Sequence, residues 1–226
     1  MKILGIISEY NPFHNGHKYH IDKSKELTGA EAVVAVMSGS FVQRGEPAFA
    51  DKWLRAQTAV MSGADLVIEN PFVYACNSAQ VFADGAVNIL DGLGCIDFLS
   101  FGSEAGSVDA LVKFASETDE FKDRLHSALE QGMTYPKAVS FAYGDDDDVM
   151  TGPNNILGIE YIKVLNRIKS GIEPVTVKRS DRGYHSYETE GIFASASKIR
   201  SIAAKGEDFS EFVPYSYKGY IGGLYY

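Results

Sequence analysis

The sequence predicts an α/β protein built on a doubly wound parallel sheet. Short apolar runs of strand length, rich in β-branched or aromatic residues, alternate with segments of helical periodicity. Buried parallel strands have this composition, and their runs here end in Ser, Asn or Gly. The alternation gives the order β-α-β-α-β-α-β, which favours a sheet with helices on both faces.

The first half of the chain supplies four strands and three crossover helices. Strands are expected at residues 2–8, 32–38, 65–70 and 97–103. Helices are expected at residues 16–29, 51–64 and 77–94. One face of the third helix carries residues at four-residue steps: Val81, Gly85, Ile89 and Leu93.

The second half continues this pattern after an insertion. Residues 107–143 have helical periodicity and many charges, so we expect a helical insertion there. A helix follows at 152–171, where Pro153 suits the first turn. Its apolar stripe consists of Leu157, Tyr161, Val164, Leu165 and Ile168. A fifth strand at 173–179 and a helix at 195–206 complete the pattern.

Composition narrows the class of protein. The chain has 226 residues and a net charge of −9, which argues against non-specific, charge-driven nucleic-acid binding but allows a local basic patch. Cys76 and Cys95 have neither the number nor the spacing of a disulfide framework or a zinc site, which fits a reducing cytoplasm. No run approaches the roughly 18 apolar residues of a membrane span, so we expect no membrane partner.

A loop with two histidines follows the first strand, in "EYNPFHNGH". Ligands of open parallel sheets bind beyond the carboxyl ends of the strands, where helix N-termini favour anions. Gly16 lets a phosphate approach the backbone, and His14 and His17 can donate hydrogen bonds to it. The alternative is a polar helix cap; we interpret the loop as a cradle for ATP. His20 either joins this site or faces solvent.

The helix at 195–206 opens on "SASKIR" and supplies a second phosphate motif. Ser195, Ser197 and the backbone N–H groups can hold a phosphate, while Lys198 and Arg200 add positive charge. Taken alone, these residues also fit an ordinary serine cap on a basic helix. Together with the histidine loop, they predict an adenylyl-transfer site with one motif on each side of the triphosphate.

These two motifs resemble the HIGH-type nucleotidyltransferase superfamily, whose architecture is Rossmann-like. The segments "GIISEYNPFHNGHKYHI", "VMSGSFVQRGEPAFADKWLRAQTAVMSGADLVIENP", "FGSE" and "GPNNILGIEYIK" are more specific. They resemble the tRNA(Met) cytidine acetate ligase family over residues 1–205, the expected catalytic domain. Family members carry a further helical region, so residues 206–226 are expected to be a tail or the start of that region.

The resemblance implies an ATP-dependent ligase. Enzymes of that family activate acetate to acetyl-adenylate, release pyrophosphate, and acetylate N4 of the wobble cytidine of elongator tRNA(Met). The implied ATP-binding residues are Ile7, Glu9, Asn11, Phe13, His14, Gly16, His17, His20, Gly102, Asn154, Arg179 and Ser195. The implied catalytic residues are His14, His17, Lys18, Ser197 and Arg200. Mg²⁺ is expected to arrive with the triphosphate, without assigned protein ligands.

Several of these roles have plain alternatives. Gly102 either meets the adenine or ribose through its backbone or only ends a strand. Asn154 either binds the nucleotide or helps to cap a helix, and its neighbour Asn155 is the alternative ligand. Arg179 reaches the phosphates or base, or pairs with an acidic neighbour at the surface. Arg44 is a candidate for the acyl carboxylate or the tRNA, because a guanidinium suits both.

Two other acidic and basic groups bear on function. We interpret the aspartates at 145–148 as a solvated loop, because four consecutive carboxylates point in different directions. A local tRNA-docking face is expected from the basic residues Lys163, Arg167, Lys169, Lys178, Arg179, Arg182, Lys198 and Arg200.

The other functions that the motifs allow are a cofactor adenylyltransferase acting on a small phosphorylated substrate and a non-catalytic nucleotide- or RNA-binding module.

Overall fold

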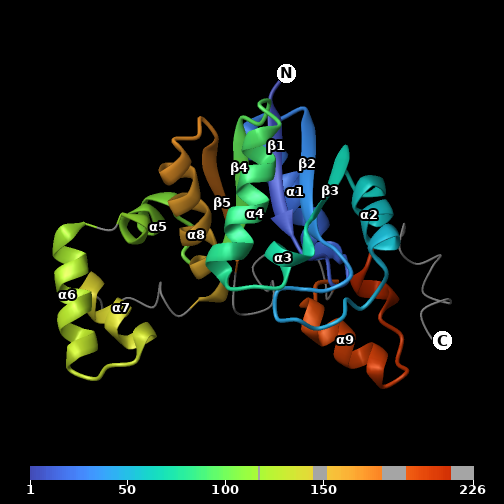
Figure 1. The fold of residues 1–226 in the computed structure, drawn as a ribbon. Helices are drawn as coiled ribbons and strands as arrows, with labels where there is room; N and C mark the ends of the chain where they lie inside the picture. Colours follow the sequence, from blue (N-terminus) through green and yellow to red (C-terminus); the bar gives the residue numbers. More distant parts are fainter. Residues whose placement is uncertain (117, 145–151, 180–191, 215–226) are drawn as a thin grey trace.

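The protein contains a parallel five-stranded sheet with helices on both faces, as the sequence predicts (Figure 1). The computed structural model describes residues 1–116, 118–144, 152–179 and 192–214. The sheet order is β3-β2-β1-β4-β5, and every neighbouring pair is parallel. The strands are β1 (Ile3–Ser8), β2 (Ala32–Ser38), β3 (Leu66–Asn70), β4 (Phe98–Ser103) and β5 (Glu173–Lys178).

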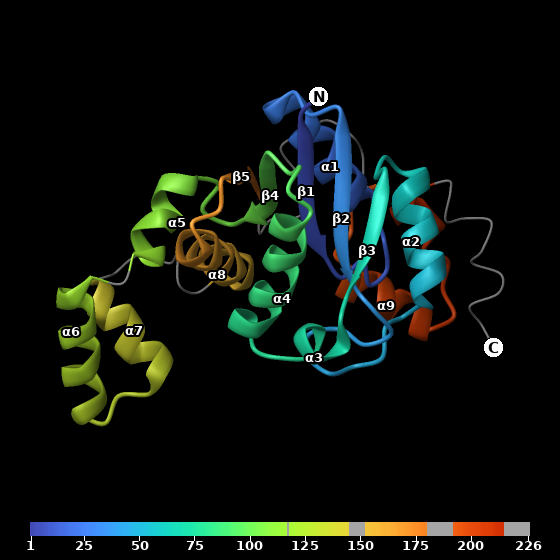
Figure 2. The same cartoon turned by 45° about the horizontal axis from the view of Figure 1, so that its top comes forward.

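Alternate residues of the central strands pack into two apolar layers. On one face, Leu4 and Ile6 of β1 pack with α1 (Asn15–Thr28) and α2 (Lys52–Met61). On the other face, Ile7 of β1 packs with α4 (Ala79–Gly92) and α8 (Pro153–Ile168). Figure 2 shows the sheet between these two layers of helices. The fold thus buries both faces of β1, whose carboxyl end carries the histidine loop.

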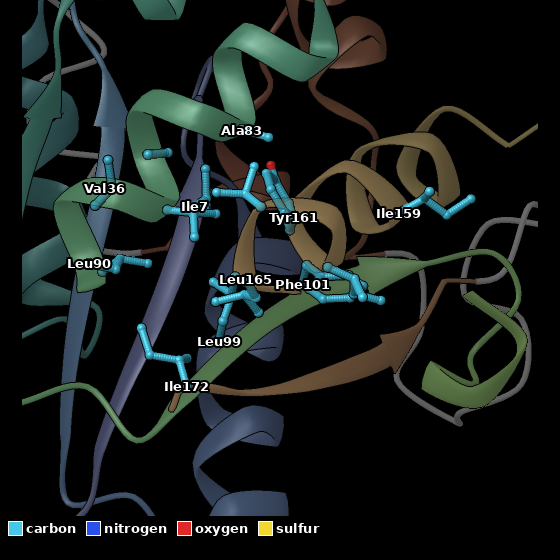
Figure 3. Packing of buried hydrophobic residues seen from close by; sticks show 14 of the residues in the cluster. Ile7, Val36, Ala83, Leu90, Leu99, Phe101, Ile159, Tyr161, Leu165 and Ile172 are labelled. Atoms are coloured by element: carbon cyan, nitrogen blue, oxygen red, sulfur yellow. The ribbon is translucent and has the colours of Figure 1, made fainter. Parts of the chain in front are cut away.

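The layer under α4 and α8 is the larger part of the core (Figure 3). Gly158 lets α8 approach β4, because a Cβ there would lie 2.5 Å from the Phe101 ring. Of the expected stripe on α8, Tyr161, Val164 and Leu165 are buried, which confirms the inward face of this helix.

The expected face of α4 is only partly correct: Gly85 is buried and Ile89 packs against the main core. Leu93 lies outside the helix and is 40% exposed. The helix instead buries Phe82, Ala83, Gly85, Ala86, Val87 and Leu90. Four-residue steps also connect Phe82, Ala86 and Leu90, so the spacing alone does not distinguish the two faces.

The expected insertion at 107–143 contains three helices. The first, α5 (Val108–Ala115), packs on α8 and contributes Leu111 to the main core. The others, α6 (Asp119–Glu130) and α7 (Tyr135–Tyr143), form a hairpin that projects from the β5 side of the molecule (Figure 1). This hairpin has its own small cluster around Phe121.

The remaining helices lie near the carboxyl ends of the strands (Figure 1). The short helix α3 (Phe72–Ala75) has no counterpart in the sequence-based prediction, and α9 (Ala196–Ala204) is followed by a 3₁₀ turn, η2 (Ser210–Phe212). Phe209 and Phe212 pack with Ile199 of α9 in a separate apolar cluster. The aspartates at 145–148, Arg182 and the tail beyond residue 214 lie outside the described residues. Within the described ranges, no helix is both long and apolar enough to cross a membrane.

Candidate active site

A cavity of about 600 Å³ opens at the carboxyl ends of the strands. Its walls come from the loops after β1 and β2, the ends of β4 and β5, and the N-terminal parts of α1, α4, α8 and α9. Predicted site residues that line it are Ile7, Glu9, Asn11, His17, His20, Gly102, Asn154, Arg179, Ser197 and Arg200. Five other predicted residues do not line it: Phe13, His14, Gly16, Lys18 and Ser195.

His14 is the N-cap of α1 and is only 6% exposed. Its Nδ1 accepts a hydrogen bond from the backbone N–H of Gly16 at 3.1 Å. The backbone N–H of His14 donates to Nδ1 of His17 at 3.2 Å, and the two rings stack with centroids 3.8 Å apart. The cap interpretation is therefore correct for His14, and this cap also orients His17.

The capping bonds select the tautomers of both rings. Nδ1 of each ring accepts a backbone N–H, so the proton of each neutral imidazole lies on Nε2. His17 also lines the cavity. It can therefore present an Nε2–H donor to an anion, as an oxyanion-type group requires.

The two histidines of the loop and His20 of α1 are all held in the neutral form. Burial, with the nearby positive charge of Arg179, lowers the pKa of His14 to about 3 and that of His20 to about 4. Burial also lowers the pKa of His17 well below its usual value, assisted by His14. Tyr10 and Phe13 enclose the His17 ring, with centroids at 4.9 and 5.4 Å. These imidazoles are therefore uncharged at neutral pH, and each neutral ring carries one N–H that can donate a hydrogen bond.

Arg179 brings positive charge to the cavity from the end of β5. Its side chain packs over Gly102, where a Cβ would lie 2.7 Å from the Arg179 Cδ. Gly102 is therefore required by the arginine beside it, a contact that the sequence-based prediction did not include. Gly102 and Arg179 both line the cavity, so the glycine positions the charge there.

Arg200 joins α9 to the histidine loop. Its Nη1 donates to the carbonyl oxygen of Asn11 at 2.7 Å. Ser195 caps α9 by accepting the N–H of Lys198 at 3.2 Å, and its Oγ lies 3.0 Å from that of Ser197. Ser195 is thus a helix cap, while Ser197 and Arg200 face the cavity.

The two adjacent asparagines have different positions. Asn154 lines the cavity, and its Nδ2 donates to Glu104 Oε1 at 2.6 Å. Asn155 is 1% exposed and its Oδ1 accepts the N–H of Ala105. Glu104 also accepts the backbone N–H of Asn155 at 2.8 Å. Burial raises the pKa of Glu104, but its hydrogen bonds together outweigh this effect and lower the pKa. Sequence reasoning missed Glu104, although it directly follows β4 in "FGSE".

The loop after β2 forms another wall of the cavity. Gln43, Arg44 and Glu46 line it, and the Gln43 N–H donates to Glu9 Oε1 at 2.8 Å. This places Arg44 on the ligand side, as its position after β2 predicts.

Arg55 of α2 is a buried anchor that sequence reasoning missed. It is 0% exposed, and its guanidinium donates to backbone carbonyls of Glu9, Ser38, Gly39 and Ala50. Its bonds to Glu9 and Ser38 measure 2.7 and 3.0 Å. The one available signal was an arginine within an otherwise apolar and neutral part of the helix, "LRAQTAVM".

Two predicted residues have structural surroundings instead of cavity contacts. Lys18 is exposed and pairs with Asp22 on the surface of α1, with Nζ and Oδ2 2.8 Å apart. Phe13 is 0% exposed and packs in the layer under α1. Among the described residues, no group of three or more His, Cys, Asp or Glu side chains could hold a metal ion.

Comparison with known proteins agrees with this arrangement. The family model for HIGH Nucleotidyl Transferase matches residues 1–221. The chain therefore belongs to the HIGH nucleotidyl transferase family, the class that the sheet and the histidine loop define.

The more specific resemblance expected from the motifs is also confirmed. The chain is 52% identical over 207 residues to the tRNA(Met) cytidine acetate ligase of Caldicellulosiruptor saccharolyticus, covering 88% of this chain and 52% of that relative. A protein of the same name from Thermoanaerobacter sp. is 49% identical over 226 residues, covering 95% and 56%. The chain spans about half the length of the curated relatives it matches.

The solved structures of Thermotoga maritima TmcAL have the same fold. The form bound with alpha-thio ATP is 36% identical, with a TM-score of 0.87 over 99% of this chain and 56% of that chain. The apo form superimposes with a TM-score of 0.89.

Proposed function

We propose that this chain is the nucleotide-binding core of a tRNA(Met) cytidine acetate ligase. Its substrates would be ATP, acetate and elongator tRNA(Met), and its product N4-acetylcytidine at the wobble position. One observation carries the proposal: His17, Arg179, Ser197 and Arg200 line a single cavity at the strand ends, in a chain about half identical to proteins of that name. Cys76 and Cys95 are free thiols, which supports a reducing cytoplasm as its location.

The first half-reaction follows from the site's donors. An acetate oxygen attacks the α-phosphorus of ATP in line, and the bond from that phosphorus to the bridging oxygen breaks. Pyrophosphate leaves while the Nε2–H of His17 and the guanidinium groups of Arg179 and Arg200 stabilise its charge. A neutral imidazole suits this role, because it can donate without first losing or gaining a proton.

The second half-reaction consumes acetyl-adenylate. The cytidine N4 attacks the acetyl carbonyl carbon, AMP leaves and the amine loses a proton. No protein nucleophile is needed. Arg44 in the wall formed by the loop after β2 is our candidate for orienting the acetate carboxylate or a tRNA phosphate. Mg²⁺ would enter with the triphosphate and neutralise part of its charge.

The decisive experiment is acetate-dependent exchange of labelled pyrophosphate into ATP, with and without tRNA(Met). Exchange that requires acetate is expected and would support the ligase. Exchange or ATP turnover that instead requires a small phosphorylated substrate would favour a cofactor adenylyltransferase. ATP binding without any exchange would contradict catalysis by this core alone.

A further inference from the structure

A row of buried polar side chains lies behind the cavity, between α1 and β4. Nε2 of His20 is 3.0 Å from Oγ of Ser100, which is 2.7 Å from Oγ of Ser24. Ser24 and Ser100 are both 0% exposed, whereas His20 reaches the cavity wall. The three groups therefore form a chain that leads from the interior to the ligand side.

The number of protons on these three side chains determines which group donates and which accepts in each hydrogen bond. Each hydroxyl has one proton to donate, and Ser24 Oγ and Ser100 Oγ contact only each other and His20 in the part of the chain that the structure describes. If His20 donated from Nε2, then either Ser100 or Ser24 would hold a buried hydroxyl proton without an acceptor. An unsatisfied buried donor is costly.

Only one arrangement gives both hydroxyl protons an acceptor within this row. Ser24 donates to Ser100, and Ser100 donates to Nε2 of His20. Nε2 is then unprotonated, so the neutral ring carries its proton on Nδ1. His20 is neutral near pH 7, because burial and the positive charge of Arg179 keep its pKa low.

We propose that Ser100, supported by Ser24, is a positioning residue that fixes His20 as an Nδ1–H donor to the nucleotide. The assignment rests on the proposed function for the identity of the ligand. Within the described residues, Nδ1 of His20 has no protein partner, so it is available to a phosphate or ribose oxygen. His20 and His17 would then donate to the nucleotide from opposite ring nitrogens, Nδ1 and Nε2.

The tautomer can be measured without any nucleotide, by imidazole ¹⁵N spectra of the whole chain at pH 7. Wild type is expected to show His20 protonated on Nδ1. Ser100→Ala is expected to lose this tautomer and show Nε2–H or a mixture. Ser24→Ala should keep it, because the Ser100 proton still has Nε2 as its acceptor.

Ser38→Ala is the matched control. Ser38 is another 0% exposed serine, on β2 of the same sheet, and its Oγ has no partner within the described residues. It should leave the His20 signals unchanged. A wild-type His20 protonated on Nε2, or a tautomer that survives in Ser100→Ala, would overturn the proposal.

A second pair of variants tests the use of Nδ1. An asparagine side chain places its NH₂ near the position of histidine Nδ1, and a glutamine places it near Nε2. His20→Asn should therefore bind ATP close to wild type, whereas His20→Gln should bind about three- to tenfold more weakly, the loss of one hydrogen bond. The reverse order would overturn the nucleotide contact.

These measurements separate the two proposals. Wild-type chain that binds no ATP would contradict the proposed function and, with it, the nucleotide contact of His20. The spectra of the free protein would still decide whether Ser100 fixes the tautomer. ATP binding by a chain whose His20 is protonated on Nε2 would overturn the positioning role of Ser100 and leave the proposed function in place.

Discussion

Two of the helix N-termini at the cavity, those of α1 and α9, are attached to the protein in different ways. The α1 terminus belongs to the main fold: its cap, His14, is buried and Ile21 packs under the sheet. The α9 terminus belongs to a smaller cluster around Ile199, and Arg200 joins it to the histidine loop. Asn15 of α1 also donates to the carbonyl oxygens of Ile192 and Glu211, which lie on either side of α9. From this difference we expect residues of the α1 side to control the rate of the chemical step, and residues of the α9 side to control the affinity for the nucleotide.

The largest expected effect is on the α1 side. His17→Ala removes the Nε2–H donor, and acetate-dependent pyrophosphate exchange should fall by about a hundredfold or more, as for other lost oxyanion donors. His126→Ala is the matched control, because that histidine lies on the surface of α6 with a side chain 77% exposed. Unchanged exchange in His17→Ala would refute the assignment of this residue.

The second-largest effect is a loss of folding stability in acid, caused by the buried histidines of the α1 side. His14 and His20 have folded pKa values of about 3 and about 4, below the usual 6.5. Between these values and 6.5 the unfolded chain binds more protons, so stability present at pH 7 is lost as the pH falls. For these two histidines, the free energy of unfolding should drop by about 2.5 kcal/mol from pH 7 to pH 5.5.

Urea unfolding at several pH values measures this drop. His14→Asn, which keeps a good N-cap residue, should reduce the pH dependence. A midpoint that stays constant from pH 7 to pH 5.5 would show that these imidazoles are not protected from protonation.

A smaller effect is expected where α9 meets the loop. Arg200→Ala removes a charged donor from the cavity and its bond to Asn11, so the KM for ATP should rise about tenfold. The melting temperature should change little, since α9 keeps its own apolar cluster. Lys205→Ala, at the far end of α9, is the control for lost charge. An equal rise in both variants would mean that only net charge matters.

The smallest effect concerns the cap of α9. Ser195→Ala loses the bond to the Lys198 N–H and should cost about 1 kcal/mol, confined to this helix. Faster amide hydrogen exchange in the first turn of α9, without a change in α1, would confirm the local effect. Ser195→Asn should restore protection. Loss of protection in both helices would show that the two termini are coupled more tightly than their contacts indicate.

The sequence was sufficient for the sheet and for the location of the site. The strands are continuous apolar runs, and the histidine loop directly follows the first of them, so topology places it at the ligand edge. The buried face of α4 could not be chosen this way, because neighbouring four-residue series are both apolar. The four-residue helix α3 is too short to show a period.

The residues that hold the site residues in position could not be predicted from the sequence, for a different reason. Glu104 holds the start of α8 across 51 residues of chain, and Ser100 meets Ser24 across 76. Such pairs depend on tertiary packing, and no local spacing marks them. Motifs thus identified groups that face the ligand, whereas the residues that orient those groups required the structure.

Arg55 has a mechanical consequence. One rigid, planar group binds the chain just after β1, just after β2 and just before α2. Those three segments are therefore cross-linked at a single point, and the loops that carry Asn11 and Arg44 cannot shift independently near it. A lysine would keep the charge but not the several fixed donor directions. Any closure of these loops over a substrate would then be a shared movement of both walls.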